Sequence, residues 1–449
     1  MTKNLSEKQS LLDDLIKRAK AAGADACDAI LVGGTSTSVG MRGGELEELE
    51  RSEGTDLGLR VFVGQQQAMV SASDIRPSEF DMLISRALDM AKNSPAEPYA
   101  TLASADMLSN QTADDLNIWD AQEPDVEVLK DIALRAEKAA LDVEGVTNSD
   151  GGHAGFSHAS IALATSNGFV GGYNSSSFSI SVSAVAGEGV HMERDYDYSS
   201  KHHFNDLSNA EVIGRHAGER AVKRLNPKKV PSGQFPIIYD PRVGNSLLGH
   251  FADAIHGASI ARKSSFLQNH MNQQIFADSI NIVDDPHVVK GLKSKPFDAE
   301  GLQNDRLDLV EDGVLQHWLL NLSTAKQLGL TSNGRATRGT SSPPGIGSTN
   351  LYIAAGTISR DDMIKDIKSG LYLTELVGMG VNGITGDYSR GAAGFWIEDG
   401  EIAYPVSEIT IAGNLKDMFL NMTAADDLEF KYGTNAPTLR LDGMTIAGL

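Results

Sequence analysis

Residues 386–415 constrain the fold of this chain more than any other stretch, because they contain a strong hairpin signal. Asp399 and Gly400 separate the β-prone runs FWIE and EIAY. An Asp-Gly pair between such runs favours a two-residue turn that joins antiparallel strands. Asn414 follows the second run and is suited to cap a short helix that begins at Leu415. The stretch is therefore expected to fold as a hairpin followed by a helix.

A glycine-rich segment at residues 386–394 precedes the hairpin. Residues without a Cβ permit close approach of another molecule, so open backbone amides are expected here, available to a ligand or to another chain. A loop that only makes turns is the alternative, and composition alone does not separate the two. The residues singled out for peptide or partner binding are Gly386, Asp387, Tyr388, Ser389, Arg390 and Gly391.

Charge and composition limit the partners of the chain. Its 39 basic residues stand against 60 acidic ones, which gives a formal net charge of −21. Such a surface repels phosphate backbones, so no nucleic-acid partner is expected. The N-terminus lacks an apolar signal segment, and no later run is long enough to cross a bilayer, so the cytoplasm is expected and a membrane is not. The single cysteine, Cys27, excludes an intramolecular disulfide framework and a cysteine-rich metal cage.

The order of predicted elements divides the chain into three parts. Residues 1–110 are expected to form an N-terminal α/β domain, and residues 120–230 a middle α/β segment that packs with it. Residues 231–449 form the C-terminal part. In the first domain, strands are predicted at 28–32 and 36–42, with a break at the glycine pair between them, because paired glycines favour turns.

One predicted helix, at residues 243–260, carries side chains that can bind metal. His250, Asp253 and His256 lie off its apolar arc. Histidines four residues apart can share a zinc ion, whereas His250 and His256 are six apart and point in directions about 120° apart. Phe251 follows His250 where a zinc peptidase needs a glutamate. The two histidines are therefore weak metal candidates, and helix-surface histidines that bind nothing are the favoured alternative.

Two further pairs of residues have functional and structural interpretations. His202 and His203 could chelate a metal, although a solvated loop explains them as well. Arg335 and Arg338 could clamp a carboxylate, because the guanidinium fork binds one through two hydrogen bonds. Their alternative is a pair of surface-loop arginines. No nucleophile elbow, Walker motif or dinucleotide fingerprint is present in the sequence.

Several segments together resemble the TldD/PmbA family, also called modulators of DNA gyrase, and its PmbA (TldE) branch in particular. The resemblance covers essentially the whole chain. It implies an α+β fold, in which an N-terminal α/β region with helices packed on mostly antiparallel strands precedes a β-rich C-terminal domain. It also implies a dimer. The segments that carry the resemblance are RVFVG at 60–64, LLGH at 247–250, RKSSFL at 262–267, and residues 333–350 and 386–415.

The resemblance also implies a division of labour between two subunits. In the family, a TldD subunit resembles a zinc metallopeptidase with an H-E-x-x-x-H helix and a cysteine ligand from the C-terminal domain. It works as a heterodimer with a TldE subunit on short unfolded peptides. Aligned with this helix, His250 matches the first histidine, but Phe251 and Ile255 occupy the glutamate and second-histidine positions, and His256 comes one residue too late. The cysteine ligand is missing, because Cys27 lies in the other half of the chain.

A TldE-like subunit without catalytic residues or zinc of its own is therefore the preferred hypothesis, and zinc is expected in a TldD-like partner. Residues 386–394 are expected to help enclose the peptide and to present backbone groups to it as an added strand. An autonomous metallopeptidase that uses His250 or His256 with unconventional ligands is one alternative. A non-enzymatic binding protein that modulates DNA gyrase is another. In isolation the chain could also pair with a second copy of itself.

Overall fold

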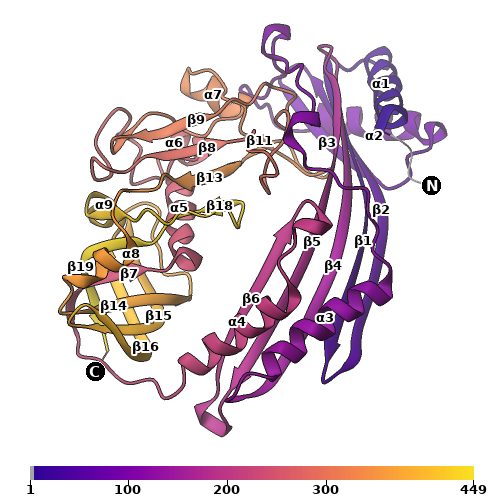
Figure 1. The fold of residues 1–449 in the computed structure, drawn as a ribbon. Coiled ribbons are helices and arrows are strands. Elements are labelled where there is room, and N and C mark those ends of the chain that lie inside the picture. Colours follow the sequence, from indigo (N-terminus) through magenta and orange to yellow (C-terminus); the bar gives the residue numbers. More distant parts are fainter. Residues whose placement is uncertain (1–4, 449) are drawn as a thin grey trace.

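The computed structural model describes residues 5–448, and its N-terminal half is built on one six-stranded antiparallel sheet (Figure 1). The strand order is β3-β2-β1-β4-β5-β6. Strands from the first predicted domain and from the middle segment thus share one sheet, joined where Ile30 of β1 faces Leu163 of β4. The strands are β1 (Ala26–Arg42), β2 (Glu45–Val63), β3 (Gln66–Ala72), β4 (Val146–Thr165), β5 (Val170–Ala186) and β6 (Glu193–Lys201).

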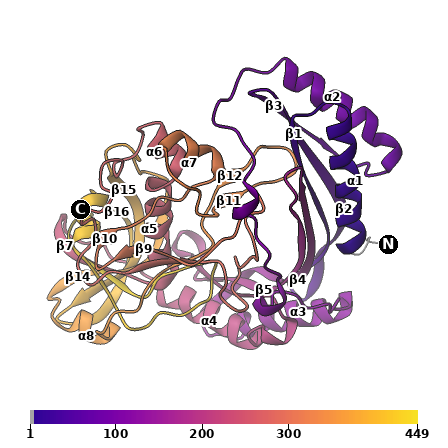
Figure 2. The same cartoon turned by 90° about the horizontal axis from the view of Figure 1, so that it is seen from above.

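Four helices cover one face of this sheet: α1 (Leu5–Ala21), α2 (Phe80–Lys92), α3 (Val126–Leu141) and α4 (Ala210–Lys223). Side chains alternate between the two faces of a strand. On β1, Cys27 and Leu31 pack in the core beneath α1 and α2, and Val39 packs in the core beneath α3 and α4. Ile30 lies on the opposite face, in a cluster with Phe297 of the C-terminal half. The sheet therefore stands between its helices and the C-terminal region (Figure 2).

The predicted break at Gly33 and Gly34 is wrong, because β1 is continuous through both residues. A Cβ on Gly34 would lie 2.5 Å from the carbonyl oxygen of His158 on β4. A Cβ on Gly33 would lie 2.9 Å from the Nζ atom of Lys8 on α1. The glycines therefore serve close packing across the sheet and beneath a helix, and neither makes a turn.

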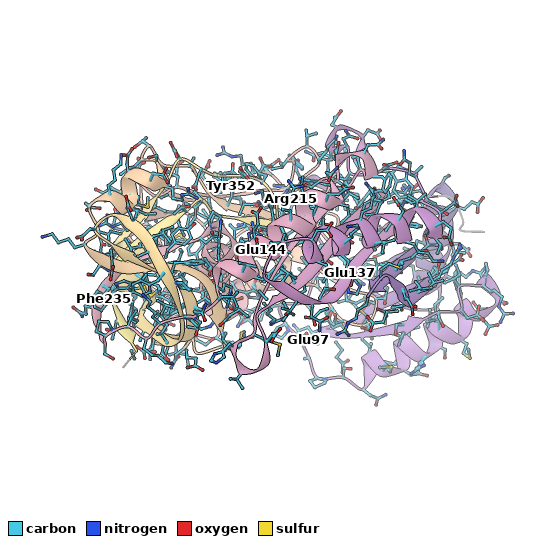
Figure 3. The ribbon with its side chains drawn as sticks, turned by 60° about the horizontal axis from the view of Figure 1, so that its bottom comes forward. Glu97, Glu137, Glu144, Arg215, Phe235 and Tyr352 are labelled. Atoms are coloured by element: carbon cyan, nitrogen blue, oxygen red, sulfur yellow. The ribbon has the colours of Figure 1, made fainter. Side chains whose placement is uncertain are left out.

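A buried carboxylate fastens α3 to the sheet at the hairpin between β1 and β2. Glu137 on α3, labelled in Figure 3, is 1% exposed. It accepts hydrogen bonds from the backbone N–H of Gly43 at 2.9 Å and from the hydroxyl of Ser149 at 2.6 Å.

Phe235, also labelled in Figure 3, lies in the C-terminal region and contacts Trp396, with ring centroids 5.0 Å apart.

The C-terminal region contains a second six-stranded sheet with the order β16-β15-β14-β7-β19-β17. An additional pairing of the end strand β16 with β19, the strand next to the other end, closes five of the strands into a barrel-like sheet. Most of its pairs are antiparallel, and β14 with β7 is a parallel exception. The strands are β7 (Gly233–Tyr239), β14 (Ser369–Val377), β15 (Asp387–Glu398), β16 (Glu401–Asn414), β17 (Met422–Ala424) and β19 (Leu439–Ala447).

Shorter elements complete the C-terminal region beside this sheet. A five-stranded sheet has the order β10-β9-β8-β13-β18, and β11 pairs with β12 separately. These strands are β8 (Ile282–Asp285), β9 (Leu307–Glu311), β10 (Val314–Leu315), β11 (Ala336–Thr337), β12 (Gly345–Ile346), β13 (Asn350–Ile353) and β18 (Thr434–Asn435). The helices are α5 (Pro241–Ala254), α6 (Gly257–Ala261), α7 (Leu322–Leu328), α8 (Arg360–Lys365) and α9 (Leu415–Leu420).

The predicted hairpin and helix at residues 386–415 are confirmed. Asp399 and Gly400 both have positive φ, 50° and 83°, as a two-residue type I′ turn requires. Asn414 caps α9 by accepting a hydrogen bond from the N–H of Lys416 at 3.1 Å. The α+β fold class, with its β-rich C-terminal region, is confirmed as well. No helix within residues 5–448 is long and apolar enough to span a bilayer.

Candidate functional site

The helix predicted at residues 243–260 is two helices, so the predicted arrangement of its histidines is wrong. α5 ends at Ala254 and α6 begins at Gly257. Between them the chain pairs with Leu319, which donates its N–H to the Ile255 carbonyl at 3.0 Å and accepts one from Gly257 at 2.8 Å. A Cβ on Gly257 would lie 2.8 Å from the Leu319 carbonyl oxygen, so this contact needs a glycine.

His256 has a structural position at this break. Its Nδ1 accepts a hydrogen bond from the N–H of Ala258 at 3.2 Å and thereby caps α6. Burial lowers the pKa of His256, and the nearby Asp253 carboxylate acts in the opposite direction. The His256 ring therefore serves as the N-cap of α6 and does not share a helix face with His250, which lies on α5.

His250 lies on α5 beside Tyr388 of β15, with the ring centroids 6.0 Å apart and the rings near perpendicular. Its Nε2 atom and the Tyr388 hydroxyl are both buried, and neither has a hydrogen-bond partner within residues 5–448. Burial lowers the pKa of His250, Arg390 lowers it further, and Asp253 opposes both. Burial likewise raises the pKa of the Tyr388 hydroxyl. Both groups are therefore expected to be neutral at neutral pH.

The predicted binding segment at 386–394 is part of a strand, so the expectation of an open loop is wrong. β15 begins at Asp387, and alternation along it buries Tyr388 and Arg390 while Asp387 and Ser389 are exposed. The six predicted residues therefore separate into two sets. Tyr388 and Arg390 lie close to His250, whereas Asp387 hydrogen-bonds Thr385 at the surface.

Both edges of this part of β15 are already paired. β16 occupies one edge, with Asp387 opposite Asn414 and Gly391 opposite Thr410. On the other edge, Ser389 donates its N–H to the carbonyl of Gly380 at 2.7 Å. The predicted backbone docking of a peptide strand does not fit these residues, because an added strand requires a free edge. Only their side chains remain available to a ligand.

A cavity of about 310 Å³ opens beside Arg390, between the N-terminal sheet and the C-terminal region. β5 and β6 form one wall, to which Ser183 and Arg194 contribute. α5, β14 and β15 form the other, with Ser246, Thr374 and Arg390. Ser246 lies four residues before His250 on α5, so both are on one side of this helix.

The charges around the cavity are unequally matched. Four arginines line it together with two carboxylates, those of Asp195 and Glu375. Arg242 binds Asp195 at 2.8 Å, and Arg224 binds Glu375 and lies 3.5 Å from Asp195. Both carboxylates are thus neutralised by these two arginines. The two remaining arginines, Arg194 and Arg390, form no ion pair with a described residue.

The predicted carboxylate clamps, Arg335 and Arg338, do bind carboxylates, but those of this chain itself. The Arg335 side chain is fully buried and pairs with Asp284. Arg338 is also fully buried and binds Asp28 of β1 at 2.6 Å, which joins the C-terminal region to the N-terminal sheet. Arg60 of β2 shares the same carboxylate. We call Asp28, Arg60 and Arg338 the paired cluster.

His202 and His203, for which a metal site and a solvated loop were both open, contact backbone carbonyls. His202 is buried, with Nδ1 2.5 Å from the oxygen of Ser176 and Nε2 3.0 Å from that of Gly291. Nε2 of His203 lies 2.9 Å from the oxygen of Asn117. These contacts connect the sheet to neighbouring loops, which accounts for both rings without a metal.

Zinc does not fit the donor set around His250. No three His, Cys, Asp or Glu side chains are grouped suitably for a metal ion in residues 5–448. Phe251, where the family resemblance implies a glutamate, is fully buried and packs against Phe276, with centroids 5.3 Å apart. The Arg390 guanidinium already supplies a positive charge close to His250, and a like charge disfavours a cation.

Family models match three successive parts of the chain. They describe PmbA/TldA metallopeptidase domain 1 at residues 27–91, the central domain at 119–225 and the C-terminal domain at 232–448. The Metalloprotease PmbA of Escherichia coli O157:H7 is 39% identical over 416 residues, which are 92% of this chain and 90% of that protein. The chain belongs to the PmbA/TldD family.

Other members of the PmbA/TldD family agree with this assignment. A Metalloprotease PmbA homolog from Haemophilus influenzae is 37% identical over 96% of this chain and 94% of its own length. A solved structure from Bacteroides thetaiotaomicron, described as a modulator of DNA gyrase, covers both chains completely with a TM-score of 0.92 at 27% identity. TldE from Thermococcus kodakarensis has the same fold, with a TM-score of 0.85 over 98% of this chain and 100% of its own, at 19% identity.

Sequence reasoning missed the opposite wall of the cavity. Arg194 and Ser183 belong to β6 and β5, about 200 residues before Arg390 in the sequence. No motif joins these residues, and only the docking of the sheet on the C-terminal region brings them together. The sequence offered one signal for Arg390 itself. It follows Tyr388 by two residues in a strand, so the alternation of side chains places both on the inward face.

Proposed function

We propose that this chain is a TldE-type subunit of a heterodimeric zinc metallopeptidase that processes or degrades short unfolded peptides. In this proposal the chain has no catalytic residue and holds no zinc, and a TldD-like partner supplies both. The observation that carries it is Phe251, buried in an aromatic core where the family's catalytic helix has a glutamate.

The chemistry of zinc peptidases explains why this position matters. Zinc activates a water molecule, and a nearby carboxylate accepts its proton during attack on the peptide carbonyl. A phenylalanine ring cannot accept that proton. Ile255, at the second-histidine position, cannot bind zinc and is itself fully buried. Membership of a metallopeptidase family supports a role in peptide processing, and the fold shared with a TldE is compatible with the role of the non-catalytic subunit.

The proposed contribution of this chain is to hold the substrate. The cavity between the N-terminal sheet and α5 is lined by side chains from both halves of the chain, as expected of a wall that encloses a peptide. Tyr388 and Arg390 belong to this wall or lie directly behind it, because Arg390 lines the cavity and Tyr388 packs on His250.

Reconstitution with a TldD-like chain tests the proposal. Co-purification should recover a pair of one subunit each, with zinc in the partner and peptidase activity only in the pair. The isolated chain, either monomeric or paired with itself, should contain far less than one zinc ion per chain. Tightly held, near-stoichiometric zinc or peptidase activity in the isolated chain would instead support an autonomous metallopeptidase. Capture of DNA gyrase in place of a TldD-like chain would also contradict the proposal.

A further inference from the structure

Arg390 is a buried cation without a matching anion. It is 9% exposed, and the one hydrogen bond of its side chain within residues 5–448, from Nε to the carbonyl oxygen of Val377, is 3.5 Å long. No carboxylate within residues 5–448 forms an ion pair with it. Its two terminal nitrogens are not among the buried unpartnered atoms, so they open into the cavity, where a ligand can bind them. A ligand that brings a negative charge would remove this imbalance.

The cavity beside Arg390 has room for such a ligand. Its volume of about 310 Å³ is at the lower end of the range for small-ligand sites. Arg194 stands on the opposite wall and is exposed, so a second free guanidinium faces the same space. The carboxylates of the cavity do not compete for Arg390, because Arg224 and Arg242 already bind them.

The shape of the guanidinium group indicates which anion fits. Its planar fork matches a carboxylate with two parallel hydrogen bonds, and burial strengthens both. Ser246 and Thr374, on the same wall, add hydroxyl groups that already bond to backbone carbonyls and retain acceptor capacity for a peptide N–H. A long polyanion is disfavoured by the net charge of −21.

We propose that Arg390, with Arg194 opposite, forms a carboxylate-binding site for short peptides. The carboxylate is either the free C-terminus of the peptide or an aspartate or glutamate side chain, since both present the same group. This proposal rests on the proposed role in peptide processing, and it names the substrate feature that the chain recognises. His250 and Tyr388 lie beside Arg390, and neither carries a negative charge that would pair with its guanidinium.

Titration calorimetry of the purified chain tests the site directly. The probes are penta-alanine with a free C-terminus and penta-alanine amide. Two amidated peptides with a central glutamate or glutamine separate the side-chain source from the terminal one. We expect a carboxylate peptide to bind about 10- to 100-fold more tightly than its neutral counterpart, as for a hydrogen bond to a charged group. The peptide pair that shows the preference identifies the source.

Variants assign the preference to Arg390. Arg390→Met should abolish it, and Arg390→Lys should retain part of it, because lysine keeps the charge without the fork. Arg86→Met is the matched control, since Arg86 is an exposed arginine on α2 far from the cavity, and it should behave as the unchanged chain. Equal binding of carboxylate and neutral peptides, absence of any binding, or a preference that survives in Arg390→Met would each overturn the proposal.

The reconstituted pair separates this proposal from the proposed function. If the pair cleaves the carboxylate and neutral members of both peptide pairs with equal KM, the carboxylate site is refuted while the role as a TldE-type subunit stands. If no active pair forms, but the isolated chain shows the carboxylate preference that Arg390→Met removes, the site stands and the proposed function fails. Arg390→Met should raise KM for the carboxylate peptide and leave its kcat nearly unchanged, because Arg390 holds the substrate away from the reacting bond.

Discussion

The buried arginines of the paired cluster and Arg390 differ in whether a carboxylate of this chain balances their charge. In the paired cluster, Arg60 and Arg338 share the carboxylate of Asp28 at the junction of the two halves of the chain. Arg390 is nearly as well buried, yet the one hydrogen bond of its side chain within residues 5–448 is a long one to a carbonyl. The first setting is complete without a ligand, and the second is not.

The difference separates a structural role from a binding role. Burial raises the pKa of Asp28, but Arg338 and Arg60 together lower it overall, so the carboxylate is ionised in the folded chain. Such a group stabilises the fold only while its partners remain. The guanidinium of Arg390 instead lowers the pKa of the neighbouring His250 and forms no ion pair within residues 5–448. The free-energy cost of this unpaired positive charge is offset when a ligand supplies the anion.

Removal of Asp28 should have the largest effect on stability. Asp28→Ala leaves two buried guanidinium groups without a partner and should lower the free energy of unfolding by about 3–5 kcal/mol. Urea unfolding followed by circular dichroism measures it. Asp13→Ala, which removes an exposed ion pair with Lys17, is the control and should cost below about 1 kcal/mol. Equal stability of the two variants would show that the paired cluster stabilises the fold no more than an exposed ion pair does.

A pH titration should reveal a second carboxyl beside the paired cluster. Burial and the neighbouring Asp298 raise the pKa of Glu300 from 4.5 to about 8, so the folded chain retains a proton that the unfolded chain releases. Stability from this group is present below pH 4.5 and is lost as the pH rises toward 8, by up to about 5 kcal/mol. Glu300→Gln should flatten this decline in urea unfolding. An unchanged pH profile in the variant would exclude a protonated Glu300.

Loss of the α9 cap should have a moderate effect near the unpaired arginine. Asn414 accepts a hydrogen bond from Lys416 and donates to Asp387, at the start of the strand that carries Arg390. Asn414→Ala should cost about 1 kcal/mol, as typical caps do. Thermal unfolding measures the change, with Asn110→Ala, an exposed position, as the control. A loss as large as that of Asp28→Ala would mean that the strand depends on this one cap.

Replacement of Arg390 should have the smallest effect on stability. Arg390→Met removes a buried charge that has no ionic partner, so the free energy of unfolding should change by less than about 0.5 kcal/mol or rise slightly. Arg338→Met is the matched comparison and should destabilise the chain, because Asp28 then loses one of its two partners. The thermal unfolding temperatures of the two variants, measured under the same conditions, test this difference in stability. A similar loss in both would place Arg390 among the structural arginines.

Predictions from local sequence held where a few adjacent residues decide the geometry. The turn at Asp399 and Gly400 and the cap at Asn414 depend on backbone preferences within four residues, and both are as predicted. Leu247, Leu248 and Phe251 lie on the apolar face of α5, and all three are buried. A helix or hairpin of this kind is recognisable because its signal repeats within one or two turns.

Predictions failed where a distant segment decides the geometry. The helix expected at 243–260 is broken because Leu319 pairs with residues 255–257, a contact that no local pattern announces. Gly33 and Gly34 suggested a turn, but β4 and α1 pack against them and keep the strand continuous. The glycine-rich residues 386–394 suggested a loop, but β16 and residues near Gly380 pair with both of their edges.

The sequence by itself determined the hairpin, the helix faces, the family resemblance and the absence of a zinc-binding pattern around His250, because each depends on residue identity at short spacing. Only the tertiary structure decided which arginines are paired. Arg338 reaches Asp28 from 310 residues away, and Arg390 meets a cavity wall made by β5 and β6. Electrostatic balance depends on distance in space, and the packing of the sheet against the C-terminal region sets those distances.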